Sequence, residues 1–86
     1  MSNTLSYSDL AGLLQARAGV TVDPGDLEQP GAQFDDFGVD SLGLLGVVGE
    51  LENRHDLKVT PGAESAKTPH EFLELVNGSL SAKAGA

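Results

Sequence analysis

Few residues of this chain have side chains that could do chemistry, and Ser41 is the most distinctive of them. It stands in the run Gly38-Val39-Asp40-Ser41-Leu42, directly before the most apolar part of the chain. A serine in this setting could act as a nucleophile, cap a helix or carry a covalent modification. The chain has no cysteine, so neither a disulfide nor a thiolate metal site can add chemistry or stability.

A nucleophilic role for Ser41 is poorly supported. A nucleophile elbow places a glycine two residues before the serine at a strand-to-helix turn, whereas Gly38 stands three residues before Ser41 and no strand is visible. A triad would also need a histidine within reach, and nothing in the spacing brings His55 or His70 there. We therefore expect two surface histidines and no catalytic residue, and a serine hydrolase is the weakest hypothesis.

Three other apparent motifs fail on their context. Asp36-Phe37-Gly38 spells the metal-binding tripeptide of kinases, but 86 residues cannot hold a kinase. The glycines at 43, 46 and 49 follow no strand and do not form a dinucleotide-binding fingerprint. The acids around Asp40 lack the ligand spacing of a calcium loop. The sequence predicts no metal site.

The net charge of −8 is concentrated in the middle of the chain. Nine acidic residues and one basic residue lie between Asp23 and Asp56. Such a surface repels nucleic acid and favours basic protein partners. The N-terminus lacks the pattern of a signal peptide, and no apolar run approaches the ~20 residues of a membrane span. We expect a monomeric cytoplasmic domain without nucleic-acid or membrane contacts.

Two helices are marked by capping signals. Ser6 and Asp9 have the spacing of a capping box, and Gly19 is typical of a helix end. Thr68 is expected to cap a helix that begins at Pro69. Apolar residues repeat at helical intervals in both: Leu10, Leu13 and Leu14 in the first, and Phe72, Leu73, Val76 and Leu80 in the last.

The segment that follows Asp40 is predicted to be a third helix, capped by Asp40 or Ser41. At 100° per residue, four apolar residues fall in a sector about 100° wide and should face the core: Leu44, Val47, Val48 and Leu51. Gly46 and Gly49 lie nearly opposite this sector, with Gly43 at its flank, so the glycines are expected to point away from the bundle. Leu42 is also expected to face solvent.

The remaining segments are predicted to be mostly loops. Residues 20–39 form a long loop that Leu27, Phe34, Phe37 and Val39 could pin to the bundle, and residues 60–67 allow one brief helical turn. The predicted fold is an all-α four-helix bundle, with three main helices, one short helix and a long loop between helices one and two. We expect one domain over residues 1–86, with its core at about 5–80 and a flexible tail at 81–86.

A resemblance to a known family rests on these segments. Phe37-Gly38-Val39-Asp40-Ser41-Leu42 resembles the attachment motif of acyl carrier proteins, in which Asp-Ser-Leu opens the second helix. Residues 68–78 resemble the last helix of carriers from type II aromatic polyketide synthases, and residues 9–19 are similar to their first helix. The resemblance covers about residues 5–80.

The resemblance implies a carrier subunit of antibiotic biosynthesis with no catalytic groups of its own. Ser41 would be esterified with 4′-phosphopantetheine from coenzyme A, whose thiol would hold acyl or poly-β-keto chains as thioesters. The implied partners are a phosphopantetheinyl transferase, the ketosynthase/chain-length factor, a malonyl transferase, and a ketoreductase or cyclases. The implied recognition residues are Asp35, Asp36, Asp40, Leu42, Leu45, Glu50 and Glu52, and the implied acyl-cavity and core residues are Leu44, Val47, Val48, Leu51, Phe72 and Val76.

The sequence departs from the family pattern on the outer face of the second helix. Positions that usually hold acids resemble Gly43 and Gly46 here. We hypothesise that this smooth face lets a partner or the prosthetic arm approach the backbone closely. The alternatives are a fatty-acid synthesis carrier or a peptidyl carrier, and then a non-carrier helical interaction domain in which Ser41 is only a cap.

Overall fold

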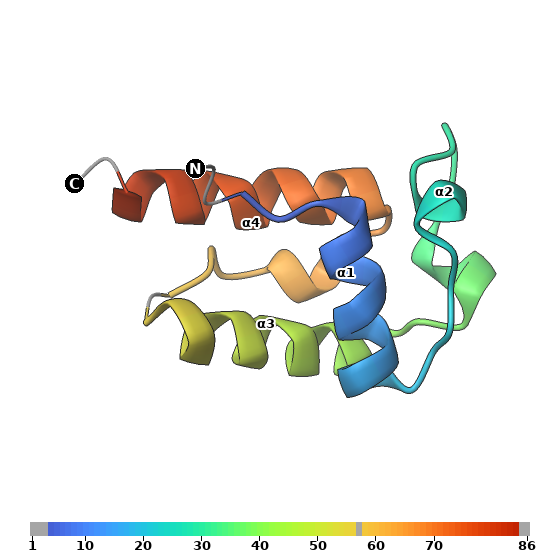
Figure 1. The fold of residues 1–86 in the computed structure, drawn as a ribbon, viewed down its shortest axis with the longest axis horizontal. Helices are drawn as coiled ribbons and strands as arrows, with labels where there is room; N and C mark the ends of the chain where they lie inside the picture. The colour runs from blue at the N-terminus through green and yellow to red at the C-terminus, as the bar shows by residue number, and fades with distance from the viewer. Residues whose placement is uncertain (1–3, 57, 85–86) are drawn as a thin grey trace.

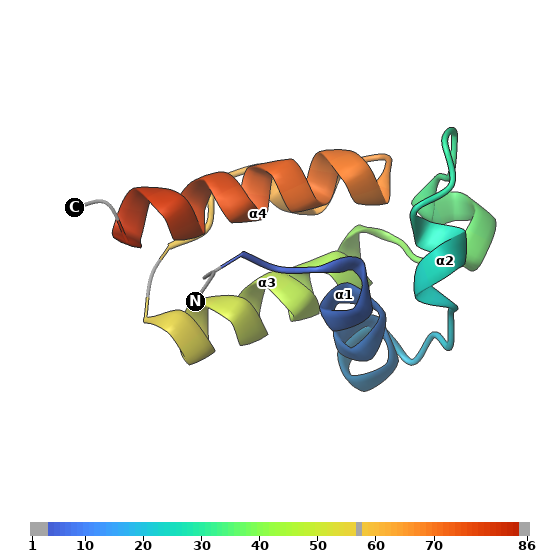
Figure 2. The same ribbon diagram turned by 45° about the horizontal axis from the view of Figure 1, so that its top comes forward.

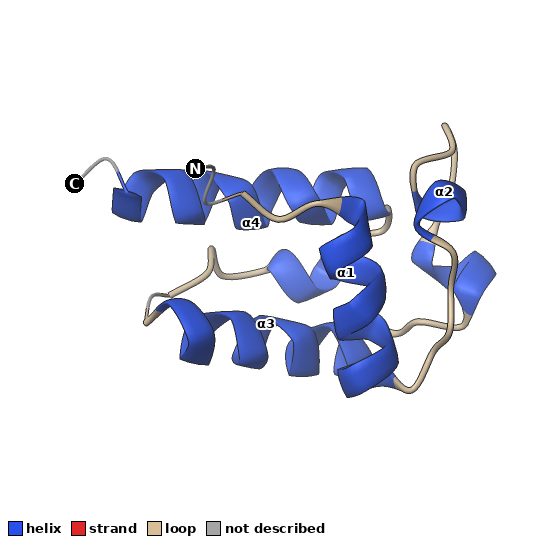
Figure 3. Ribbon diagram, viewed as in Figure 1, coloured by secondary structure: helices blue, strands red, loops and turns tan. Residues whose placement is uncertain are grey.

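The protein is described by a computed structural model that covers residues 4–56 and 58–84. All regular structure in this part of the chain is helical (Figure 3). The elements in chain order are α1 (Tyr7–Leu13), η1 (Leu14–Ala18), α2 (Pro24–Leu27), η2 (Phe34–Phe37), α3 (Ser41–His55), η3 (Ala63–Ser65) and α4 (Pro69–Ala84). The predicted all-α class is confirmed.

The two longest helices, α3 and α4, lie side by side and run in the same direction, as Figures 1 and 2 both show. The chain after α3 returns along them and forms the short helix η3 before α4 begins. Helix α1 crosses α3, and α2 and η2 lie at the end where α3 and α4 start (Figure 1). The first residues of α3 and the residues just before α4 are therefore neighbours.

Helix α1 begins as the capping signal predicts. The Ser6 hydroxyl accepts a hydrogen bond from the Asp9 amide at 3.1 Å, and the Asp9 carboxylate accepts one from the Ser6 amide at 3.1 Å. The helix then widens into η1, a π-helical turn, and ends at Gly19 with a positive φ of 68°. Glycine takes this left-handed conformation with no Cβ penalty, which explains the stop.

Helix α4 is also capped as predicted, because the Thr68 hydroxyl accepts from the Glu71 amide at 3.1 Å. Its Asn77 side chain bonds both polar backbone groups of Leu5: it accepts from the amide and donates to the carbonyl oxygen at 3.1 Å. This pair of bonds fastens the segment before α1 to the middle of α4. The helix continues to Ala84, so it includes residues 81–84 of the predicted tail.

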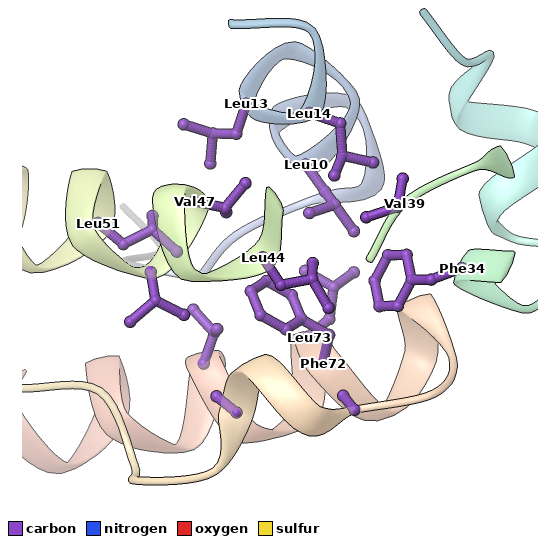
Figure 4. Close-up of a cluster of buried hydrophobic side chains, with 14 of the residues drawn as sticks. Leu10, Leu13, Leu14, Phe34, Val39, Leu44, Val47, Leu51, Phe72 and Leu73 are labelled. Atoms are coloured by element: carbon purple, nitrogen blue, oxygen red, sulfur yellow. The ribbon is translucent and has the colours of Figure 1, made fainter. Parts of the chain in front are cut away.

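The core lies where α1, α3 and α4 meet (Figure 4). The predicted core faces of all three helices are buried, and Leu27, Phe34 and Val39 join them from the connecting segment. The rings of Phe34 and Phe72 pack edge to face, with centroids 5.9 Å apart and an interplanar angle of 86°. Aromatic pairs in this geometry are worth about 1 kcal/mol beyond their buried area.

The prediction that residues 20–39 form a loop is incomplete, because this segment contains α2 and η2. Asp23 caps α2 by accepting from the Gly25 amide at 2.8 Å, and Pro24 occupies the first helical position. These short helices satisfy backbone groups locally while Leu27 and Phe34 reach the core. The predicted brief turn in residues 60–67 is confirmed as η3.

The prediction that the glycines of α3 all face away from the bundle is wrong for two of them. A Cβ built on Gly43 would lie 2.9 Å from the Cβ of Ala18, and one on Gly46 would lie 3.4 Å from the Cβ of Arg17. Only at Gly49 would an added Cβ meet open space. Placing residues at 100° intervals identified the core face of α3 correctly. It could not show that η1 covers the adjoining face. Gly43 and Gly46 let η1 approach α3 closely.

Candidate functional site

Ser41 is the first residue of α3, and the capping role belongs to its neighbour. The Asp40 carboxylate accepts a hydrogen bond from the Gly43 amide at 2.9 Å. The Ser41 side chain is exposed, and within the described residues its hydroxyl forms no hydrogen bond. The hydroxyl is therefore free for another use.

The backbone before Ser41 is held firmly in place. Gly38 has a positive φ of 74° and ends η2, and the Val39 amide donates to the Phe34 carbonyl oxygen at 3.1 Å. The Val39 side chain is buried in the core. These contacts fix the start of α3 relative to η2, so the position of Ser41 is set by its scaffold.

Two large apolar side chains near Ser41 are exposed. Leu42 is 74% exposed and Leu45 is 47% exposed. Among the described residues, no other large hydrophobic side chain is exposed. Both leucines lie on the first two turns of α3. Neighbouring exposed apolar groups of this kind mark a candidate docking surface.

A cavity of about 290 Å³ opens beside Ser41. Its walls come from the η2–α3 junction, from α3 and from the segment between η3 and α4. The side chains and backbone that line it belong to Gln33, Phe34, Asp35, Val39, Asp40, Ser41, Leu44, Glu64, Ser65, Ala66 and Lys67. Lys67 is the single basic residue among them.

A larger groove of about 980 Å³ lies farther along α3, against the segment that precedes η3. Its lining residues are Leu45, Val48, Glu52, Asp56, Lys58, Val59, Thr60, Pro61, Glu64, Gly78 and Ser79. Glu64 lines this groove as well as the cavity of Ser41. Glu64 is thus common to the walls of both.

The wall of the groove is fastened to both long helices. The Val59 amide donates to the Glu52 carboxylate of α3 at 2.9 Å. The Thr60 amide donates to the Ser79 hydroxyl of α4 at 3.0 Å. Because each helix holds one of two adjacent amides, residues 59 and 60 bridge α3 and α4.

All the predicted recognition acids except Asp35 have structural partners within the chain. Besides the contacts of Asp40 and Glu52, the Asp36 carboxylate accepts from the Gln33 amide at 3.1 Å. Asp35 is exposed at the edge of the Ser41 cavity. The structure thus gathers Asp35, Asp40, Leu42 and Leu45 near Ser41 and places Glu50 and Glu52 farther along α3.

Glu50 is paired with two arginines. Its carboxylate bonds Arg17 of η1, and its second oxygen lies 2.6 Å from Nε of Arg54. The hydrogen bond from Arg17, followed by that from Arg54, lowers the pKa of Glu50. The Glu50 side chain is only 12% exposed, while the two arginines are more than half exposed. This cluster fastens η1 to α3.

Neither histidine lies at the Ser41 cavity. His55 is the last residue of α3, about 20 Å from Ser41 at 1.5 Å per residue. His70 lies 3.5 Å from the Tyr7 hydroxyl and 2.7 Å from the Glu74 carboxylate. Among the described residues no group of three His, Asp or Glu side chains could hold a metal ion.

The residues predicted to line an acyl cavity are packed together in the core. Leu44, Val47, Leu51, Phe72 and Val76 are at most 1% exposed. Val48 is 9% exposed and lines the large groove. The groove runs along the outer edge of this core.

Comparison with known proteins agrees with this geometry. The family of the phosphopantetheine attachment site matches residues 8–76. The curamycin polyketide synthase acyl carrier protein of Streptomyces cyaneus is 50% identical over 80 residues, which are 93% of this chain and 92% of that one. The oxytetracycline polyketide synthase carrier of Streptomyces rimosus is 40% identical over 88% of this chain and 82% of its own.

Solved structures of such carriers share the fold. A solution structure of the oxytetracycline acyl carrier protein has a TM-score of 0.71 at 34% identity, covering 94% of this chain and 87% of the other. The actinorhodin carrier of Streptomyces coelicolor, solved with a 3,5-dioxohexyl triketide mimic, has a TM-score of 0.75 at 33% identity, covering 95% and 98%.

The fold and the family match define a non-catalytic carrier domain of the kind that bears phosphopantetheine. The chain belongs to the acyl carrier proteins of polyketide synthases, and it works with the enzymes of such a synthase. Its site suits the prosthetic group of this family, because Ser41 offers an exposed hydroxyl with an open cavity beside it. Within residues 4–56 and 58–84, none of the helices combines the length and the hydrophobicity of a transmembrane span.

Several residues that line the cavity and the groove were not predicted from the sequence, among them Lys67, Thr60 and Ser79. Lys67 lines the Ser41 cavity, and Thr60 and Ser79 line the groove. They come from separate segments and form no motif. The parallel arrangement of α3 and α4, which places residue 67 beside the start of α3, would have been needed to find Lys67.

Proposed function

We propose that Ser41 is the residue to which 4′-phosphopantetheine is attached, and that the protein carries acyl and poly-β-keto chains of a type II polyketide synthase. The observation that carries this proposal is the division of roles at the start of α3. Asp40 provides the cap, so the neighbouring Ser41 hydroxyl is exposed and unbonded within the described residues. Modifying Ser41 would leave the cap intact.

The chain supplies a favourable setting for a phosphodiester at Ser41. The first amides of a helix have no partners within the helix, and the helix dipole places partial positive charge there. The prosthetic group, when bound, supplies the thiol that forms thioesters. The protein positions that arm, and the firmly held Val39 keeps the attachment point at one place.

The exposed leucines suit enzymes that must recognise the carrier and then release it. Leu42 and Leu45 form a small apolar patch, with Asp35 and Asp40 nearby. Acidic residues at a rim mainly speed association with basic partners. The proposed partners are a phosphopantetheinyl transferase, a ketosynthase/chain-length factor, a malonyl transferase, and a ketoreductase or cyclases. We place them and the carrier, as one monomeric domain, in the cytoplasm.

Intact-mass measurement tests the proposal. The protein is incubated with coenzyme A and a phosphopantetheinyl transferase, and one phosphopantetheine is expected on the wild type and none on Ser41→Ala. Ser65→Ala is the matched control, because Ser65 is an exposed serine that lines the same cavity. It should gain the group normally. Addition to Ser41→Ala would refute the assignment.

A further inference from the structure

We propose that Lys67 is the positioning residue for the phosphate of the arm: its ammonium group neutralises the phosphodiester on Ser41. This inference rests on the proposed attachment at Ser41. It concerns a residue that is far from Ser41 in sequence and belongs to a different part of the fold. Lys67 lies two residues before α4, whereas Ser41 opens α3.

The fold brings these two residues to one cavity. Helices α3 and α4 run in the same direction, so their starting ends lie together (Figures 1 and 2). Ser41 and Lys67 both line the cavity of about 290 Å³ at that end. Phe34 also joins the two segments, because its amide donates to the Lys67 carbonyl oxygen at 3.0 Å.

The backbone of Lys67 is fixed on both sides. Besides the bond from Phe34, the Lys67 amide donates to the Glu71 carboxylate at 3.2 Å. Its side chain is exposed, and within residues 4–56 and 58–84 its ammonium group forms no ion pair or hydrogen bond. The backbone of Lys67 is therefore held in place, while its ammonium group is free to pair with an anion.

The negative charges around Ser41 would repel a phosphodiester unless a cation such as Lys67 lies nearby. The other ionisable residues that line the cavity are Asp35, Asp40 and Glu64. A phosphodiester on Ser41 would add a further negative charge to this set. Lysine is a common partner of phosphate because it acts as a compact positive charge. Lys67 is the one lining residue that can offset the repulsion.

Phosphorus NMR of the loaded protein tests this role directly. Apo and holo forms are prepared for the wild type, Lys67→Gln, Lys67→Arg and Lys58→Gln. Lys58 is the matched control, because it is an exposed lysine that lines the large groove and not the Ser41 cavity. The phosphodiester resonance should shift in Lys67→Gln, stay near the wild-type position in Lys67→Arg and be unchanged in Lys58→Gln.

Thermal unfolding adds a second readout. Loading should lower the Tm of Lys67→Gln, relative to its own apo form, by roughly 2–4 °C more than it lowers that of the wild type. This difference should vanish in about 1 M salt, where exposed charges are screened. An equal effect of Lys67→Gln on apo and holo forms, with no change in the phosphorus resonance, would overturn the inference.

The failure of this inference can be told from the failure of the proposed function. If Ser41 is loaded by mass but Lys67→Gln behaves like Lys58→Gln, only the role of Lys67 is refuted. If the wild type gains no phosphopantetheine, or Ser41→Ala gains it, both are refuted.

Discussion

Asp40 and Ser41 are adjacent residues with different tasks. Asp40 satisfies an amide of the first turn of α3, and Ser41 keeps an unbonded hydroxyl within the described part of the chain. From sequence alone either residue could be the cap, because both types are good N-caps. In the structure the backbone of Asp40 is extended, as expected for an N-cap, whereas Ser41 is already the first residue of the helix.

This division of tasks predicts different costs for two substitutions. Asp40→Ala should lower the free energy of unfolding by about 1 kcal/mol, because a helix cap is lost. Ser41→Ala should change it by less than about 0.5 kcal/mol, as for an exposed surface position. Urea unfolding measures both. Asp40→Asn is the control, because asparagine caps equally well; a full loss in this variant would contradict the capping explanation.

Glu50 gives the protein a defined dependence on pH. Arg17 and then Arg54 lower its pKa in the folded state. The stability that Glu50 contributes is therefore complete at neutral pH. It decreases once the pH falls below the usual value of about 4.3 for a glutamate, and it is lost as the pH passes below the lowered pKa of the folded state.

Glu50→Gln should therefore unfold at a lower urea concentration than the wild type at pH 7. The difference should shrink as the pH falls below about 4.3, where Glu50 of the wild type becomes protonated. The urea midpoints of the wild type and the variant are compared at about five pH values between pH 2 and 7. Glu28→Gln is the control, since Glu28 is exposed and forms no ion pair among the described residues. A constant gap between wild type and Glu50→Gln at every pH would count against the pairing.

At the scale of the elements, the glycines of α3 are contacts between helices. The turn η1 lies over Gly43 and Gly46: an added Cβ at Gly43 would clash with Ala18, and one at Gly46 would touch Arg17. This placement replaces the hypothesis that partners or the arm approach the backbone along the whole glycine face. Only Gly49 remains open to solvent. The face of α3 available to partners is narrower than its sequence suggests.

Two alanine substitutions separate the packing role from helix propensity. Gly49→Ala should raise the free energy of unfolding by up to about 1 kcal/mol, because alanine favours the helix and meets no neighbour. Gly43→Ala should lower it by roughly 1 kcal/mol, because its Cβ would lie 2.9 Å from that of Ala18. Urea unfolding checks both. If Gly43→Ala is as stabilising as Gly49→Ala, the close contact is refuted.

The combination of Gly43→Ala with Ala18→Gly tests the contact itself. Removing the opposing methyl group should relieve the clash, so the double variant should be more stable than the sum of the single effects predicts. Additive effects would show that the two positions do not touch.

For the whole molecule, local signals and tertiary arrangement were predictable to different degrees. The predictions of the caps Ser6 and Thr68 and of the core face of α3 are confirmed. Caps and periodicity depend on residues that are close in sequence. The covering of Gly43 by Ala18 and the placement of Ser41 and Lys67 at one cavity were not predicted, because they depend on how separate segments pack. Nor did periodicity reveal α2 and η2, since each is about one turn long.

The bond pair between Asn77 and Leu5 has a practical consequence for labelling the protein. It holds the residues before α1 against the middle of α4, and α4 ends at Ala84, away from the start of α3 (Figure 1). A fluorophore or an affinity tag joined near either of these points would leave the Ser41 end clear. Probes for watching the carrier move between enzymes are therefore best placed there.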